Sequence, residues 1–312
     1  MRLRKIGLTA AFIWLASPAI SAQPPGVPNG WSSAFVYSNG ARLHYYRGVP
    51  RPGKPVIVMV HGITDNGLSW TTLTQDLQDD YDIYMLDARG HGLSDPFTDA
   101  DTTDSLAKDV VGFVQAMKLD KPILMGHSMG AATVMRLAAQ YPELPRAVVM
   151  LDPLLGRLPP VLDADVAPLA SPAPARRPGQ LVMFGDPETL VGQNNASFHE
   201  WLTACGQQNP MWDPVDCQYW ALSKKQYHGF YTPTQMQAAR GNMAVEDALA
   251  RIAAPALILK ADASAADREA HLKTAARIRN GKLVHLDGAG HNLHHDKRPS
   301  TVKLLKEFLD RL

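Results

Sequence analysis

Apolar residues recur along the chain with two different spacings. Apolar and polar residues alternate over 33–47 on both sides of Asn39-Gly40, a pair that favours a two-residue β-turn. Further on, short runs of Val, Ile, Leu and Met alternate with longer stretches of helical periodicity. Runs without a polar face are typical of strands that helices cover on both sides. The pattern predicts an α/β protein with a mostly parallel sheet flanked by helices.

Eight strands and five core helices are expected from this pattern. The strands fall at 33–38, 41–47, 54–62, 81–87, 121–126, 146–152, 255–260 and 282–286, and the helices at 70–79, 103–119, 129–141, 265–278 and 300–312. The alternation stops over 154–245, and a structureless loop of that length would be unusual in a compact domain. We therefore expect one core, 23–153 and 246–312, with 154–245 inserted as a lid (cap) between the sixth and seventh strands.

The first residues have the pattern of an export signal. Arg2, Arg4 and Lys5 precede an uncharged, mostly apolar run at 6–16 that is too short to span a bilayer, and small residues follow. These features predict a signal peptide over 1–22 rather than an anchor helix. The protein is therefore expected to be secreted or periplasmic, without a stable membrane anchor.

Composition narrows the classes of partner. The 312 residues are 46% hydrophobic and 20% charged, and a net charge of +1 provides no basic field for nucleic acid. Cys205 and Cys217 are the only cysteines. In an oxidising compartment they are expected to form a disulfide, with two buried free thiols as the alternative. Their spacing is not that of a zinc site.

The strongest chemical signal is the sequence GHSMG at 126–130. It directly follows a predicted strand and precedes a predicted helix. The glycines allow a tight turn, which leaves the hydroxyl of Ser128 exposed at the end of the strand. Ser128 is therefore predicted to be a nucleophile, and the alternative is a structural serine in a turn.

Four motifs occur in one order along the chain: HGITDNGLSW at 61–70, DARGHGLSD at 87–95, GHSMG at 126–130 and GAGH at 288–291. In these motifs the chain resembles the α/β-hydrolase fold family over nearly its whole length apart from the insertion. The resemblance implies an α/β-hydrolase fold and an esterase-like serine hydrolase.

Two of these motifs are interpreted as parts of the framework. DARGHGLSD is expected to be a buried turn held by Asp87 and Arg89 rather than a substrate site. His61, His91 and His127 belong to turn motifs and are assigned roles in positioning the backbone.

A serine hydroxyl is a weak nucleophile and needs an adjacent base. His291 is the best candidate among the 11 histidines, because it follows the last predicted strand in a short Gly-Ala-Gly loop. It also comes after the serine, in the Ser…Asp/Glu…His order of this fold. His294 and His295 could be metal ligands, but no second cluster at ligand spacing accompanies them. We therefore expect a solvated helix start there, and neither a metal nor another cofactor.

The base needs an orienting carboxylate, for which the family has two positions. One follows the strand before the lid, where RAVVMLDP contains Asp152; the alternative is that Asp152 only opens a turn with Pro153. The other follows the next strand, where the aligned acid position carries Ser264. Asp262 would serve there only with a shifted register. Asp152 is therefore predicted, with Asp262 as the second candidate.

Cleavage of an ester or lactone develops negative charge on the carbonyl oxygen, and two backbone N–H groups must point at it. One is expected from Met129, which follows the nucleophile at a helix N-terminus. The other is expected from Ile63 in HGIT, with a plain strand-ending turn as the alternative.

Large apolar side chains are frequent in the insertion. They are expected to form the small core of the lid or to line the pocket: Phe184, Phe198, Trp201, Met211, Trp212, Tyr219, Trp220 and Tyr227. A bond between Cys205 and Cys217 would hold such a small unit together.

Together these residues predict a secreted serine hydrolase that cleaves a small-molecule carboxylic ester or lactone with an apolar part, through an acyl-enzyme. The family's dehalogenases and epoxide hydrolases use an aspartate where this chain has Ser128, and the dehalogenases bind halide where it has Ile63 and Met129. Hydrolysis of a carbon–carbon bond or an amide, perhydrolysis, and a non-catalytic ligand-binding role stay open.

Overall fold

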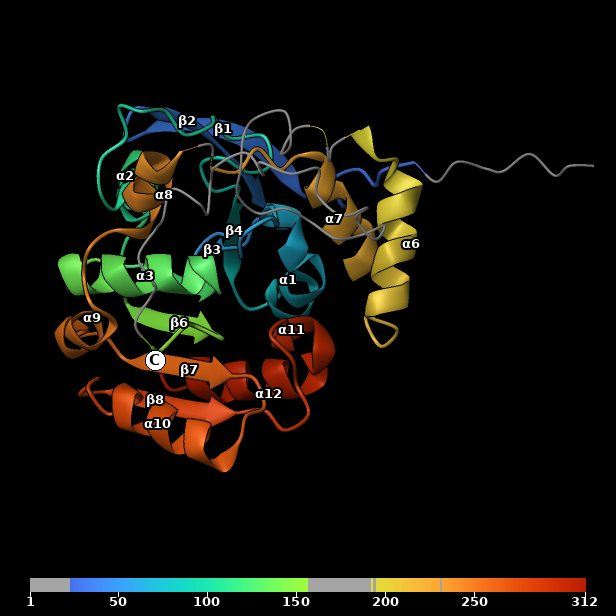
Figure 1. The fold of residues 1–312 in the computed structure, drawn as a ribbon. Coiled ribbons are helices and arrows are strands. Elements are labelled where there is room, and N and C mark those ends of the chain that lie inside the picture. The colour runs from blue at the N-terminus through green and yellow to red at the C-terminus, as the bar shows by residue number, and fades with distance from the viewer. Residues whose placement is uncertain (1–22, 157–191, 193–194, 231) are drawn as a thin grey trace, which may run out of the picture.

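The computed structural model describes residues 23–156, 192, 195–230 and 232–312. The predicted signal peptide at 1–22 therefore lies outside the described residues, as does Phe184. A sheet of eight strands runs in the order β1-β2-β4-β3-β5-β6-β7-β8, with helices on both faces (Figure 1). The strands are β1 (Ser32–Ser38), β2 (Ala41–Arg47), β3 (Val56–Val60), β4 (Asp82–Leu86), β5 (Ile123–His127), β6 (Ala147–Leu151), β7 (Ala256–Lys260) and β8 (Gly281–His285).

The predicted mostly parallel sheet is confirmed. Neighbouring strands from β4 to β8 pair in parallel, whereas the β1–β2 hairpin is antiparallel and joins β4 through antiparallel β2. Asn39 and Gly40 both have positive φ angles, 48° and 76°, as a two-residue turn between twisted strands requires.

Helices cover the sheet in two layers. The helices are η1 (Gly67–Trp70), α1 (Thr71–Leu77), α2 (Ser105–Ala116), α3 (Met129–Gln140), α6 (Phe198–Gln208), α7 (Pro214–Lys225), α8 (Pro233–Arg240), α9 (Val245–Arg251), α10 (Ala265–Ala275), α11 (Leu293–Asp296) and α12 (Arg298–Leu309). One apolar cluster joins the sheet to α2, α3, α9 and α10, and a second joins its other face to η1, α1 and α12.

Strand β3 shows why the sequence lacks polar positions here. Val58 and Val60 belong to the cluster on one face, and Ile57 and Met59 belong to the cluster on the other. All four side chains are fully buried. A strand between two helical layers has no solvent face, so an apolar run replaces the alternating pattern.

Helices α6 to α9 lie between β6 and β7 in the chain. Helices α6 and α7 pack against each other, α7 also touches η1 and α1, α8 lies against α2, and α9 lies against α3 (Figure 1). A disulfide between Cys205 in α6 and Cys217 in α7 joins the first pair, with Cα atoms 5.5 Å apart. The described helices α7, α8 and α9 therefore each pack against helices of the core.

Most of the described aromatic side chains of this segment are buried within it or against the core. Phe198 and Trp201 pack against Ala221, and Trp212 packs against the disulfide. Met211 is 84% exposed. Both expected roles occur, because Trp220 faces the cavity described below.

Within the described residues, no helix combines the length and the apolar character needed to cross a bilayer.

The disulfide gives a first prediction. Denatured protein should contain no titratable thiol until a reductant is added, because both cysteines are bonded. The variant with Cys205→Ala and Cys217→Ala should lose about 3 kcal/mol of unfolding free energy, the chain-entropy value for a loop of this size. Thiol titration and urea denaturation measure the two effects. Two free thiols in the unreduced chain would refute the bond.

Candidate active site

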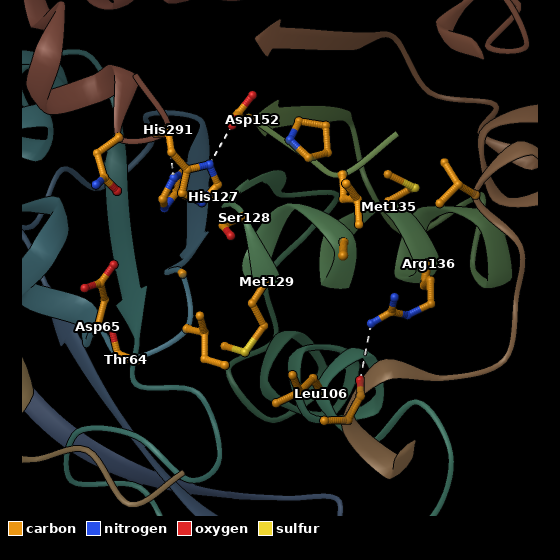
Figure 2. A pocket seen from close by; sticks show the side chains of 18 of the residues that line it. Thr64, Asp65, Leu106, His127, Ser128, Met129, Met135, Arg136, Asp152 and His291 are labelled. Atoms are coloured by element: carbon orange, nitrogen blue, oxygen red, sulfur yellow. Dashed lines mark hydrogen bonds and ion pairs between the residues drawn. The ribbon is translucent and has the colours of Figure 1, made fainter. Parts of the chain in front are cut away.

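A cavity of about 700 Å³ lies at the carboxyl ends of the central strands. Gly62, Ser128 and Asp152 line it, and each follows the end of a strand: β3, β5 and β6 respectively. In open parallel sheets this edge is where ligands bind. Figure 2 shows Ser128, Asp152 and His291 together in one part of the cavity, with Arg136 farther along it.

Ser128 lies in a sharp turn between β5 and α3. Its backbone has φ 50° and ψ −111°, a conformation that non-glycine residues rarely adopt. The flanking glycines make the turn possible: a Cβ at Gly130 would lie 1.9 Å from the carbonyl oxygen of Val60, and one at Gly126 would lie 2.2 Å from that of Gly130. The turn holds the half-buried Ser128 side chain on the cavity wall.

Asp152 directly follows β6 and contacts His291. Nδ1 of His291 lies 2.5 Å from Oδ2 of Asp152. A carboxylate can only accept, so Nδ1 carries a proton; in the neutral form of the imidazole, Nε2 keeps its lone pair. The His291 side chain is 54% exposed, which leaves Nε2 accessible from the cavity.

The second oxygen of Asp152 has its own partners. The ammonium of Lys260 lies 2.5 Å from Oδ1, and the backbone N–H of Ala261 donates to the same oxygen at 3.1 Å. Burial raises the pKa of Asp152, but the hydrogen bonds from His291, Lys260 and Ala261 outweigh it and hold the pKa well below its usual range. The carboxylate is therefore anionic throughout the neutral and mildly acidic range.

Asp262, the second candidate for the acid, occupies a different environment. Its carboxylate is 44% exposed, pairs with Arg268 and accepts the backbone N–H of Gly288 at 2.8 Å. Ser264 caps α10 by accepting the N–H of Asp267 at 3.2 Å. The structure thus brings Asp152 to His291, and it uses Asp262 to shape the loop that leads to His291.

His127, at the end of β5, holds the loop that carries His291. Its Nε2 donates to the carbonyl oxygen of His291 at 3.0 Å, and the Gly290 N–H donates to Asp296 at 2.8 Å. Burial, and then the neighbouring His291, lower the pKa of His127 to about 4. A neutral His127 has one N–H, which this bond to the backbone uses.

The other two turn histidines also bind the backbone, as predicted. His61 donates from Nδ1 to the carbonyl oxygen of Gly62 at 2.7 Å, and its Nε2 accepts the Ala88 N–H at 3.0 Å. Nδ1 of His91 lies 2.9 Å from the carbonyl oxygen of Arg89. Burial lowers the pKa of both imidazoles, which keeps them neutral.

The predicted buried turn at 87–95 is confirmed. Asp87 and Arg89 are almost fully buried. The Asp87 carboxylate accepts the N–H groups of Gly67 at 2.6 Å and Leu93 at 2.9 Å, and Arg89 binds both oxygens of Asp109. These contacts are structural and lie behind the cavity wall.

The residues predicted to supply the oxyanion N–H groups both line the cavity. Met129 is the first residue of α3, and Ile63 lies in the loop after β3. The next residue of that loop, Thr64, has a positive φ of 70°. A β-branched residue rarely adopts this conformation, so other contacts must hold the loop.

Lys224 supplies those contacts from α7. Its ammonium donates to the carbonyl oxygen of Thr64 at 3.0 Å, to the Thr64 hydroxyl at 2.9 Å and to Asp65 at 2.8 Å. The side chain is 1% exposed. Sequence reasoning missed this residue, because nothing in the SKKQ sequence distinguishes a buried lysine from a solvated one.

The expected solvated helix start at His294 and His295 is wrong. Both side chains are buried, at 2% and 8% exposure. The ring of His294 packs 4.7 Å from that of His127 and 4.9 Å from that of Trp70, and His295 lies 4.5 Å from Trp212. Helix α11 presents these rings to Trp70 at the end of η1 and to Trp212 in the turn before α7, contacts that the local sequence does not indicate. Among the described residues, no group of three or more His, Cys, Asp and Glu side chains is arranged to hold a metal ion.

The rest of the cavity wall is largely apolar. It includes Leu106, Met129, Met135, Phe230, Met236 and Met243. Arg136 lies among them, but its guanidinium is 3.1 Å from Asp104 and donates to the carbonyl oxygen of Ala239 at 3.3 Å. A ligand therefore meets polar groups beside Ser128 and mainly carbon along the remaining wall.

Known proteins match this chain over most of its length. A family model described as alpha/beta hydrolase fold matches residues 55–298. N-formylmaleamate deformylase of Pseudomonas putida is 26% identical over 282 residues, 88% of this chain and 95% of that protein. Epoxide hydrolase 1 of Caenorhabditis elegans is 24% identical over 301 residues, 93% of this chain and 73% of that protein. The crystal structure of E-2-(acetamidomethylene)succinate hydrolase has a TM-score of 0.65 at 21% identity, covering 90% of this chain and 99% of that one.

The buried ion pair below the Ile63 loop yields a stability prediction. Lys224→Met should lower the free energy of unfolding by about 3 kcal/mol or more, because it leaves Asp65 and two oxygens of Thr64 without their donor. Lys225→Met is the matched control. Among the described residues, the Lys225 ammonium donates to the carbonyl oxygen of Ala196, and losing this bond should cost about 1 kcal/mol. Urea denaturation compares the variants, and equal losses would contradict a special role for Lys224.

Proposed function

The chain belongs to the α/β-hydrolase fold family, as its four motifs predicted, and on that premise we propose that it is a serine hydrolase of small carboxylic esters or lactones. The observation that carries the proposal is the hydrogen bond from His291 to Asp152 in the cavity that Ser128 also lines. In this arrangement a carboxylate orients the imidazole, and the half-exposed His291 side chain lines the same cavity as Ser128.

The chemistry follows from these positions. Nε2 of His291 accepts the proton of the Ser128 hydroxyl as Oγ attacks the carbonyl carbon of the substrate. The negative charge that develops on the carbonyl oxygen is stabilised by the N–H groups of Ile63 and Met129. Asp152 stabilises the imidazolium formed in this step. Collapse of the tetrahedral intermediate breaks the bond to the leaving oxygen, which takes the proton from Nε2 and leaves an acyl-enzyme.

Water completes the cycle. His291 removes a proton from a water molecule as the water oxygen attacks the acyl carbon. When the second tetrahedral intermediate collapses, the bond between the acyl carbon and Oγ breaks, and His291 returns the proton to Oγ of Ser128. The products are a carboxylic acid and an alcohol, which in a lactone are two ends of one molecule.

The cavity wall supports an apolar substrate part. Met129 and Met135 face the cavity from α3, and Met236 and Met243 face it from the chain around α8. Flexible, unbranched methionine side chains adapt to irregular apolar groups. An acyl or alcohol group of moderate size would bury its carbon atoms there.

Amide cleavage is the second candidate. The relative that covers 88% of this chain is named N-formylmaleamate deformylase, and the same three groups serve an amide if His291 protonates the leaving nitrogen. Opening of an epoxide is not proposed, although one relative is an epoxide hydrolase, because the family's epoxide hydrolases attack with an aspartate where Ser128 stands here.

Export to an oxidising compartment is part of the proposal. The basic and apolar pattern of 1–22 is that of a signal peptide, and the Cys205–Cys217 disulfide suits a periplasmic or extracellular site.

The nucleophile can be tested by covalent labelling. A fluorophosphonate probe should label the wild type and not Ser128→Ala, because it needs an activated serine. Ser264→Ala is the control, since this serine caps α10 and its loss should leave labelling intact. Intact-mass measurement detects the adduct. If the folded wild type is not labelled, the protein is not a serine hydrolase, and the ligand-binding alternative gains support.

The orienting acid can be tested by a matched pair of substitutions. Asp152→Asn should lower kcat by about 10⁴-fold, because the amide disfavours the tautomer of His291 that has a basic Nε2. Asp262→Asn, in a neighbouring exposed loop, should leave kcat nearly unchanged. Initial rates on p-nitrophenyl esters of increasing chain length and on lactones measure both effects and define the substrate range. The reverse order of losses would assign the acid to Asp262.

A further inference from the structure

Lys260 places a positive charge on the side of Asp152 that faces away from His291. It is the last residue of β7, is 8% exposed, and its ammonium lies 2.5 Å from Oδ1 of Asp152. The same ammonium donates to the carbonyl oxygen of Pro153 at 2.9 Å. The two oxygens of one carboxylate thus bind two different partners, the imidazole of His291 and the ammonium of Lys260. Figure 2 shows the contact between Asp152 and His291.

We propose that Lys260 is a positioning residue that acts through Asp152 to keep His291 unprotonated, and therefore able to act as a base, at lower pH than the Asp152–His291 pair alone would allow. The proposal rests on the proposed function, in which neutral His291 is the base. No role for Lys260 was expected from the sequence, where it is only the last residue of an apolar strand.

The physical basis is the competition between two charges. An anionic carboxylate next to an imidazole favours the protonated imidazolium. A cation in contact with that carboxylate offsets its field at the imidazole, so the protonated form of His291 is stabilised less. The ammonium of Lys260 and the imidazole of His291 contact the two oxygens of the same carboxylate. In a partly solvated site, a charge at such a separation shifts the midpoint of imidazole protonation by about one pH unit.

The other groups around this site contribute less charge near neutral pH. Burial is the main cause that lowers the pKa of His127 on β5, His294 on α11, His271 on α10 and His285 on β8. The positive charge of Lys260 lowers the pKa of the last two further. His295 on α11 lies 3.1 Å from Asp216 on α7.

The nearby acids have partners of their own. Asp65, after β3, pairs with Lys224; Asp296, on α11, accepts from Trp212; Asp262 and Asp287 both pair with Arg268. Among the described residues, Lys260 is the cation in direct contact with the carboxylate that binds His291.

A purely structural role for Lys260 makes a different prediction. Asp152 has a positive φ of 44°, and Lys260 binds both its side chain and the following carbonyl oxygen, so the lysine also supports this turn. Loss of that support alone would lower stability, or lower kcat equally at all pH values. A charge effect moves the pH at which His291 titrates. The two roles are therefore separated by a titration and not by a single rate.

The experiment is an NMR titration of the His291 imidazole in the wild type, Lys260→Gln and Lys260→Arg, with His291→Gln used to assign the signal. Lys260→Gln keeps a hydrogen-bond donor but removes the charge, whereas Lys260→Arg keeps the charge. We expect the midpoint of His291 protonation to rise by about one pH unit in Lys260→Gln and to stay near the wild-type value in Lys260→Arg. The sign follows because removing the cation leaves the attraction of Asp152 for the imidazolium uncompensated.

The acid limb of kcat/KM on an ester substrate gives a second readout and should move to higher pH in Lys260→Gln by the same amount. An unchanged His291 midpoint in folded Lys260→Gln would overturn the inference. If Lys260→Gln does not fold, the inference is tested with Lys260→Arg. A His291 midpoint that moves in this variant, although the charge is retained, also overturns the inference. A shifted midpoint in a protein that neither hydrolyses esters nor binds the fluorophosphonate would instead refute the proposed function and leave the Lys260–His291 coupling in place.

Discussion

Three non-glycine residues with positive φ angles stand after the carboxyl ends of neighbouring strands, and the site depends on all of them. They are Thr64 after β3, Ser128 after β5 and Asp152 after β6, with φ angles of 70°, 50° and 44°. Such conformations cost free energy and persist only where surrounding contacts enforce them. Close packing of the flanking glycines holds the Ser128 turn, and two buried lysines, Lys224 and Lys260, hold the other two. The rigid sheet therefore turns three separate chain reversals into one constellation of functional groups.

Both lysines come from parts of the chain far from the turns that they support. Lys224 belongs to α7, between β6 and β7, and contacts a loop that follows β3. Lys260 ends β7 and contacts the residue that follows β6. Each ammonium replaces its lost hydration with carbonyl, hydroxyl or carboxylate oxygens, which is the condition for burying a charge. Because α7 is tied to α6 by the Cys205–Cys217 bond, the support of the Ile63 loop is also linked to a segment that oxidation stabilises.

The sequence predicted those features that follow from local pattern. Apolar runs located the strands, Asn39-Gly40 located the hairpin, and the GHSMG motif located the Ser128 turn, because each depends on residues next to one another. Features that depend on contacts between distant segments were not predictable in this way. Two candidates for the acid stayed open because only the path of the His291 loop decides which carboxylate it meets. His294 and His295 look solvated in the sequence because the rings that cover them come from other elements.

Asp152 connects the stability of the site with the pH range in which it can work. A carboxylate whose pKa is depressed in the folded state contributes stability that is fully present above its unfolded pKa of about 3.9 and is lost only as the pH falls through the lower folded value. Its contacts with His291 and Lys260 therefore persist in mildly acidic solution, where most surface carboxylates begin to protonate. In the proposed mechanism, the carboxylate that orients His291 therefore stays ionised in mildly acidic solution, and its protonation does not limit activity there.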